Sequence, residues 1–304
     1  MTNMFSFSDG RYAFPEGVLE EYRRSHRVGV LATMHHKEKV MTPLLEQELG
    51  IKVVVPENFN TDAFGTFTRE IKRTGDQLEA ARRKAKSALA LTNQTLAFAS
   101  EGTFAPHPVI PYISCNREIV VLIDTLNELE IVGQEFSTAT NFNHKTIKTI
   151  EEAFDFAQKI GFPEHGLVVM FDTSSESRNE IIKGIVTEKQ LTEAVELVLS
   201  KSLNHQAHIE TDMRALYNPT RMKNIEKATL DLIRKIQQVC PQCSCPGFDV
   251  TERKQGLPCA WCNFPTTMTL VAVYQCKKCD FVQEVLFPDK VEKADPAQCI
   301  YCNP

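Results

Sequence analysis

Compact apolar runs separated by amphipathic stretches fill the first 238 residues of the chain. Short runs rich in β-branched residues predict buried strands, because a strand covered on both faces shows little alternation. They lie at residues 27–33, 51–55, 95–100, 166–171, 181–186 and 207–210, and a hairpin is predicted from 118–124 and 128–136.

Stretches with apolar residues three and four positions apart predict helices between these strands. They lie at residues 37–49, 76–91, 149–160, 187–202 and 219–239. Alternating strands and helices with one hairpin predict an α/β domain with a mixed β-sheet flanked by helices. Residues 57–74, rich in Asn, Thr, Phe and Gly, predict a long loop of the kind that often carries function.

Eight of the ten cysteines fall in four CxxC pairs near the C-terminus. Two such pairs complete a tetrahedral four-sulfur site, and no secretory signal is evident, so we expect metal ligands rather than disulfides. The sequence therefore predicts two structural Zn²⁺ ions in a small zinc-ribbon-like domain of residues 239–304, after an α/β domain of residues 1–238. The paired cysteines are Cys240/Cys243, Cys259/Cys262, Cys276/Cys279 and Cys299/Cys302.

The spacing leaves the pairing of these knuckles open. Sequential pairing joins the first knuckle with the second and the third with the fourth, whereas interleaved pairing joins the first with the third and the second with the fourth. A strand at 269–274 leads into the third knuckle. Cys245 is expected to be a bystander, Cys115 a small buried hydrophobe, and Trp261 part of the zinc core.

Charge and hydropathy indicate which partners the protein is expected to bind: nucleic acid, another protein or a membrane. The net charge is −5, and the cysteine-rich domain holds six basic and seven acidic residues, so nucleic acid is disfavoured. A structural or protein-docking role suits this domain better. The chain lacks an apolar run of about 18 residues, so we expect no membrane span and a cytoplasmic location.

Candidate ligand-binding residues follow the first strand. Thr33, Lys37 and Lys39 lie where a helix N-terminus could bind phosphate through backbone N–H groups and ammonium charge. Exposed lysines in a first helical turn would explain the two lysines equally well. Lys84 lies on the basic side of the next helix, which is either solvated or faces an anion.

Three glutamates could hold Mg²⁺, which takes oxygen ligands and shares them with substrate phosphates. Glu70 and Glu79 precede the third strand, and Glu101 follows it, next to Gly102. Glu101 could instead activate water. A solvated helix face and an ordinary loop carboxylate are the alternatives.

A further polar cluster precedes the last helix. Asp212 is a candidate acid, and Arg214 and Arg221 are candidate phosphate ligands, since a guanidinium can hold two oxygens at once. Asn218 is expected to cap the helix, with Pro219 in its first position. Three more side chains either line a cleft or are merely solvated: His107, His144 and Tyr217.

Nearly the whole chain resembles an uncharacterised bacterial family. The resemblance rests on GTFTREIKR, ASEGTFAPHP, ETDMRALYNPTRM and the four-knuckle tail. It implies no assigned activity.

The first domain also resembles, distantly, the inosine/xanthosine triphosphate pyrophosphohydrolases and Maf-like proteins. The matching pieces come in the family's order: Ala32-Thr33 with Lys37 or Lys39, the stretch 79–85 (EAARRKA), Ser100-Glu101-Gly102 and Thr220-Arg221. An asparagine and an aspartate of the family's motifs are missing here. The resemblance implies an inosine triphosphatase-like fold and, less directly, the same class of reaction.

The leading hypothesis is a Mg²⁺-dependent hydrolase of a nucleoside triphosphate or related phosphoanhydride. Glu79 and Glu101 would bind the metal, while Lys37, Lys84 and Arg221 would neutralise phosphate charge. The alternative is a non-catalytic nucleotide-binding or sensing protein whose zinc domain docks a protein partner. A nucleic-acid-associated protein is a third interpretation.

Overall fold

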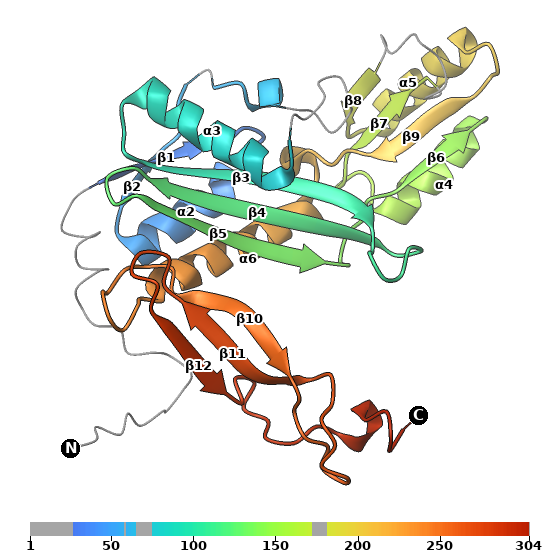
Figure 1. Cartoon of the computed structure of the whole chain (residues 1–304). Coiled ribbons are helices and arrows are strands. Elements are labelled where there is room, and N and C mark those ends of the chain that lie inside the picture. Colours follow the sequence, from blue (N-terminus) through green and yellow to red (C-terminus); the bar gives the residue numbers. More distant parts are fainter. Residues whose placement is uncertain (1–26, 58, 65–74, 172–180, 304) are drawn as a thin grey trace, which may run out of the picture. The chain divides into compact units, whose positions relative to one another are not determined.

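The computed structural model describes residues 27–57, 59–64, 75–171 and 181–303 (Figure 1). The described residues divide into two compact units, one ending at Ile233 and the other beginning at Arg234. Most of the loop predicted at 57–74, including Glu70, lies outside the described residues. None of the helices in the described ranges is long and apolar enough to cross a membrane.

A five-stranded mixed sheet forms the first half of the larger unit, in the order β2-β1-β3-β4-β5. β1 pairs in parallel with β2 and β3, whereas β3, β4 and β5 form an antiparallel meander. The strands are β1 (Val28–Ala32), β2 (Lys52–Val54), β3 (Leu96–Pro106), β4 (Ser114–Asp124) and β5 (Leu129–Ser137).

Helices cover both faces of this sheet. α3 (Gln77–Thr92) lies over one face, and α2 (Glu38–Leu49) and α6 (Pro219–Gln237) lie over the other (Figure 1). The α3 face is packed with small side chains, because Ala81, Ala85 and Ala88 let the helix approach the apolar strands closely. On the other face, Gly133 of β5 touches the backbone of α6, where a Cβ would overlap Leu232 N and Ala228 O.

A second, antiparallel sheet follows in the order β6-β9-β7-β8. Its strands are β6 (His144–Ile147), β7 (Leu167–Met170), β8 (Ile181–Ile185) and β9 (Ala207–Thr211). α4 (Ile150–Ile160) and α5 (Glu188–Lys201) pack their apolar stripes against one face, around Ile147, Val169 and Ile209. Two short 3-10 turns complete the unit, η1 (Thr61–Phe64) and η2 (Ala215–Tyr217).

The mixed α/β class was predicted correctly, but the expectation of one sheet was wrong. The strands divide between two sheets, and the short polar strand β6 had not been predicted. β3 also continues to Pro106, because its pairing with β4 runs unbroken from Leu96↔Asp124 to Pro106↔Ser114. Glu101 and Gly102 therefore lie within a strand and not after one.

The smaller unit is built on a three-stranded antiparallel sheet, β10-β11-β12. Its elements are β10 (Asp249–Gln255), β11 (Thr269–Gln275), β12 (Val282–Leu286) and the turn η3 (Pro296–Gln298). Only β11 had been predicted, because β10 is largely polar and exposed. The cysteine knuckles occupy the connections at the two ends of this sheet.

Candidate functional site

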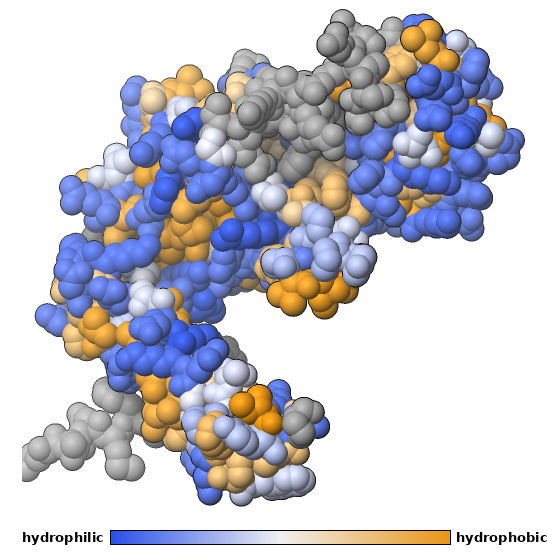
Figure 2. Space-filling model, turned by 45° about the vertical axis from the view of Figure 1, so that its right-hand side comes forward, coloured by the Kyte–Doolittle hydropathy of each residue, from blue (hydrophilic) through white to orange (hydrophobic). Residues whose placement is uncertain are grey.

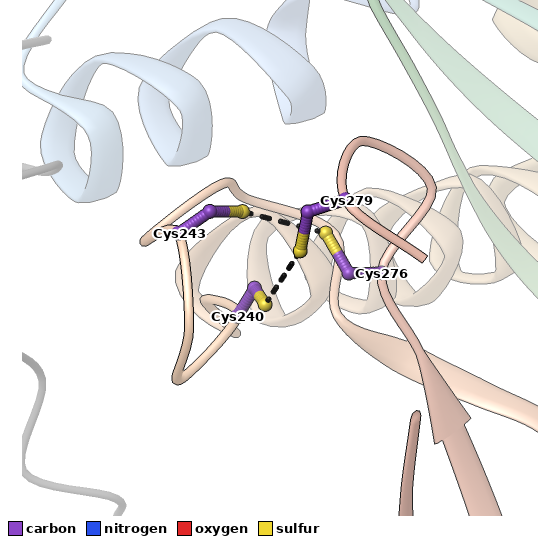
Figure 3. A group of neighbouring side chains, drawn as sticks. All are labelled: Cys240, Cys243, Cys276 and Cys279. Carbon is purple, nitrogen blue, oxygen red and sulfur yellow. Dashed lines mark hydrogen bonds between the residues drawn. The ribbon is translucent and has the colours of Figure 1, made fainter. Parts of the chain in front are cut away.

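Eight cysteines form two four-cysteine groups, and the pairing is interleaved. The first group joins Cys240 and Cys243 with Cys276 and Cys279, whose side chains point toward one another in Figure 3; the second joins Cys259 and Cys262 with Cys299 and Cys302. Ligand atoms within each group lie within 4.8 Å of one another. The structure thus decides between the two pairings that the spacing left open.

The sulfur positions fit a tetrahedral zinc ion. Zn–S bonds of about 2.3 Å place the four sulfur atoms about 3.8 Å apart. The measured Sγ–Sγ distances are 3.6 Å for Cys240–Cys279 and Cys243–Cys276, 3.8 Å for Cys259–Cys302 and 3.6 Å for Cys262–Cys299. Each group could therefore hold one Zn²⁺.

The register of the sheet produces the interleaving. Asp249, the first residue of β10, pairs with Gln275, the last residue of β11. The first knuckle precedes β10 and the third follows β11, so both lie at this end of the sheet. At the other end Gln255 pairs with Thr269, and the second knuckle follows β10.

All four knuckles share one backbone turn. The N–H of the residue after the second cysteine donates to the carbonyl of the first, at 2.8 to 3.0 Å, from Ser244, Asn263, Asp280 and Asn303. The first three of these residues have positive φ, near +57°, which Asn and Asp tolerate better than most side chains. Backbone N–H groups of Cys262 and Trp261 also lower the pKa of Cys259 to about 7, whereas the neighbouring cysteine side chains raise the pKa of Cys302 to about 12.

Three further residues, the two remaining cysteines and Trp261, had also been predicted from the sequence. Burial raises the pKa of Cys245 to about 11, and this thiol belongs to neither group. Cys115 is buried in β4, as expected. The expectation for Trp261 was wrong: its side chain is 76% exposed and does not fill the zinc core.

A cluster of buried charges lies in the larger unit, at the carboxyl end of β1. Lys37, Lys84 and Arg221 supply the positive charges, and Glu101 and Glu118 the negative ones; each is at least nine-tenths buried. Four of the five had been predicted as site residues. The structure places them around the part of β3 that extends past the end of β1, with Lys84 and Glu101 on one face of the sheet and Arg221 on the other. Glu118 had not been predicted.

Lys37 lies at the start of α2, where β1 has ended and no longer pairs with β3. Its Nζ donates to Ser100 Oγ at 3.0 Å. The pKa of Lys37 is lowered to about 7, because burial removes its ammonium from water and the positive charges of Arg221 and Lys84 lie nearby. Two successive residues with φ near +62°, His35 and His36, bring the chain to this point.

The Lys84–Glu101 pair lies on the α3 face of the first sheet. Glu101 pairs across the strands with Ile119, which belongs to the core under α3. Lys84 Nζ donates to Glu101 Oε2 at 2.5 Å. Gln77, in the first turn of α3, donates to the backbone carbonyl of Glu101 at 2.8 Å and so ties the helix start to this strand.

The Arg221–Glu118 pair lies on the opposite face, because Glu118 pairs with Gly102, the neighbour of Glu101 along β3. Arg221 Nε donates to Glu118 Oε1 at 2.8 Å, and Nη1 donates to the carbonyl of Met213. A Cβ at position 102 would overlap both Glu118 Oε1 and Arg221 Nη2. Glycine at this position therefore makes room for the ion pair.

Amide side chains hold this pair in position. Asn116 Nδ2 donates to Glu118 Oε1 at 3.0 Å, and Asn224 Nδ2 donates to Asn116 Oδ1 at 2.9 Å. Asn218 caps α6 as predicted, since its Oδ1 accepts from Arg221 N at 2.9 Å. A sequence signal for Glu118 existed: it is a charged residue directly before the apolar run of residues 119–123.

The other predicted binding residues contact other groups. Thr33 is buried and its hydroxyl donates to the carbonyl of Met34, whereas Lys39 is exposed on the first turn of α2. Asp212 accepts hydrogen bonds from Arg214 and from Gly184 N, and the Arg214 guanidinium stacks on the Tyr217 ring. These contacts brace the segment before α6.

Glu79 does not join Glu101. It lies partly exposed on α3, with ion pairs to Arg82 and Arg83. Within the described ranges, the two cysteine groups are the sets of three or more potential metal ligands that lie together, so no carboxylate cluster supports the Mg²⁺ prediction.

The two histidines predicted either to line a cleft or to be solvated make local contacts. His107 accepts from backbone N–H groups in its own turn, and the His144 ring stacks near His208 on the second sheet, with ring centroids 5.4 Å apart.

Comparison with known proteins identifies a family but no activity. A family model described as a domain of unknown function (DUF6671) matches residues 84–304. The match spans more than half of the chain, so the chain belongs to this family. No curated protein and no solved structure matches, and the resemblance to the inosine/xanthosine triphosphate pyrophosphohydrolases gains no support.

Proposed function

We propose that the buried charge cluster binds the phosphate groups of a small molecule, and that the protein hydrolyses a phosphoanhydride, with nucleoside triphosphates as the leading substrate class. The observation that carries the proposal is the composition of the cluster. Lys37, Lys84 and Arg221 are all at least nine-tenths buried, and the acidic side chains that act on Lys37 are Glu118 and Glu101.

An excess of buried positive charge is costly unless an anion compensates it. Among the residues that the structure describes, the two glutamates of the cluster pair with Lys84 and Arg221, and Lys37 donates to a hydroxyl group, that of Ser100. The lowered pKa of Lys37 is the consequence. A bound phosphate would bring negative charge to this ammonium and raise its pKa, so ligand binding should take up a proton near pH 7.

The roles of the residues follow from their positions. Lys37 and Arg221 would neutralise charge that develops on the phosphoryl oxygens, and Glu118 would position Arg221. Glu101 would activate the attacking water or accept Mg²⁺. One protein carboxylate is compatible with Mg²⁺, because this ion keeps several waters and takes other ligands from substrate phosphates.

A second candidate function is nucleotide binding without turnover. The 2.5 Å contact between Lys84 Nζ and Glu101 Oε2 favours it, because a carboxylate engaged by an ammonium is a weaker base toward water. Under this interpretation the cluster senses a nucleotide and transmits its presence through α6. The two zinc ions would be structural in either case, which requires the reducing conditions of a cytoplasm.

Release of phosphate and pyrophosphate from purified, zinc-loaded protein tests the proposal. A panel of common and deaminated nucleoside triphosphates would be assayed with and without Mg²⁺, beside Glu101→Gln and Lys37→Met. Lys86→Met is the matched control, because Lys86 lies exposed on the same helix as Lys84.

Hydrolysis that Glu101→Gln abolishes and Lys86→Met preserves would establish the enzyme and its substrate class. Thermal stabilisation by a nucleotide without turnover, lost in Lys37→Met, would establish the sensor. Neither turnover nor stabilisation with any nucleotide would refute both candidate functions.

A further inference from the structure

The two four-cysteine groups differ in what their knuckles display. In the first group the residues between the cysteines are Pro241-Gln242 and Lys277-Lys278, and in the second they are Ala260-Trp261 and Ile300-Tyr301. The large side chains of the second group point outward: Trp261 is 76%, Ile300 67% and Tyr301 62% exposed.

Zinc binding does not explain this difference. A knuckle needs its two cysteines and the backbone N–H groups between them, and the first group meets these needs with polar side chains. Trp261 N donates to Cys259 Sγ at 3.4 Å, and Lys278 N makes the same contact with Cys276 Sγ at 3.4 Å. The apolar side chains are therefore not required by the metal site that they surround.

These side chains form an exposed apolar surface, which we call the knuckle patch: Trp261, Phe264, Ile300 and Tyr301. The Phe264 and Tyr301 rings contact edge to face, with centroids 4.1 Å apart. All four residues lie on or beside the two turns that carry the cysteines of this group, so a bound Zn²⁺ would hold both turns in place. The face in Figure 2 shows several hydrophobic groups among hydrophilic residues, and exposed apolar side chains also gather on the loop of the larger unit that holds Val109, Ile110 and Ile113.

Rigid, exposed aromatic side chains are typical of the residues that dominate protein–protein binding energy. They immobilise few rotatable bonds on binding, which lowers the entropic cost of association.

The charge around the knuckle patch selects the kind of partner. Four thiolates around one Zn²⁺ carry a net formal charge of about −2. The residues between these cysteines are all uncharged, and Lys293 and Asp295, which flank Ala294 beside Cys259, carry opposite charges. Phosphates of a nucleic acid would meet repulsion here, whereas a basic side chain would be attracted.

We propose that the knuckle patch binds a protein segment that presents apolar side chains flanked by lysine or arginine. The apolar side chains would pack on Trp261 and Tyr301, and the basic groups would lie against the anionic zinc–thiolate centre. This inference does not depend on the function of the larger unit.

Selection from a random-sequence peptide display library on the zinc-loaded full chain tests the proposal. Selected peptides would then be synthesised and titrated against the wild type, Trp261→Ala and Tyr301→Ala. Gln242→Ala and Lys278→Ala are matched controls at the same knuckle positions of the first group. Zinc content is measured for every variant, so that loss of the fold is distinguished from loss of the patch.

The expected peptides combine apolar residues with Lys or Arg, and Trp261→Ala should weaken their binding roughly tenfold or more. The control variants should change the affinity less than about twofold. Peptides that bind Trp261→Ala as well as the wild type, or no enriched peptide at all, would overturn the proposal. So would Trp261-dependent binding of random single-stranded DNA, or patch-dependent self-association in light scattering.

Discussion

At the residue scale, the burial of Lys37 beside other positive charges has a measurable consequence for stability. Its pKa falls from 10.5 to about 7 on folding, so the folded state binds fewer protons than the unfolded state between these values. Below about pH 7 the group is charged in both states and its burial cost is complete. The free energy of unfolding should therefore rise with pH from about 7 to 10.5 through this group.

Lys37→Met should remove this contribution. The wild-type free energy of unfolding is expected to increase by up to about 1.4 kcal/mol per pH unit more than that of the variant. Urea denaturation of zinc-loaded protein at about pH 7 and about pH 9 measures it. Lys39→Met, which removes an exposed lysine from the same turn, should behave like the wild type. Equal slopes for Lys37→Met and the wild type would contradict the lowered pKa.

The Arg221–Glu118 pair gives a second prediction at this scale. Glu118→Ala should destabilise the larger unit by about 3–5 kcal/mol, because it leaves a buried guanidinium uncompensated. Replacing both partners, as in Glu118→Leu with Arg221→Met, should recover most of the loss. Urea unfolding of Glu118→Leu, Arg221→Met and the double variant measures the coupling free energy between the two side chains. Additive losses would show that the two side chains are not coupled.

At the element scale, the contact between β5 and α6 depends on one glycine. A Cβ at Gly133 would overlap backbone atoms of α6, which cannot turn away as a flexible side chain can. Gly133→Ala is therefore expected to cost about 1–3 kcal/mol or more, by forcing the helix off the sheet. The melting temperature should fall by roughly 2–4 °C per kcal/mol. An unchanged melting temperature would show that α6 does not pack at this distance.

The same scale shows where prediction from the sequence worked. Apolar periodicity located α3, α4, α5 and α6. Each of these helices buries one apolar face against a sheet, and the residues of that face recur three and four positions apart in the sequence. It missed β6, β10 and β12, whose side chains are mostly exposed and carry little apolar pattern. Backbone pairing with a neighbouring strand, not side-chain burial, holds these segments in place.

At the scale of the whole molecule, the two cysteine groups make a prediction about metal content. Cys240→Ser should reduce bound zinc from two ions per chain to one, and Cys240→Ser with Cys276→Ser should still retain one ion, since both belong to the same group. Cys240→Ser with Cys259→Ser should retain none. Atomic spectroscopy of the purified proteins measures this. Sequential pairing would reverse the two double-variant results.

The sequence by itself determined the α/β class, the main helices, the eight cysteines that could hold two zinc ions and most of the charged residues of the cluster. These follow from local physics: helical and strand periodicities, the reach of a CxxC turn, and the preference of charged groups for strand ends and helix starts. Lys37 and Arg221 could be named in this way, whereas Lys84 lies in the middle of α3 and Glu101 in the middle of β3, where the sequence predicted a strand end.

Only the tertiary structure decided how the pieces combine. The zinc pairing depends on the register of β10 with β11, which brings knuckles together over 33 to 43 residues of sequence. Glu118 became a partner of Arg221 because β4 pairs with β3 opposite Gly102, across 103 residues. Such contacts are set by strand register and sheet faces, which no local pattern in the sequence specifies.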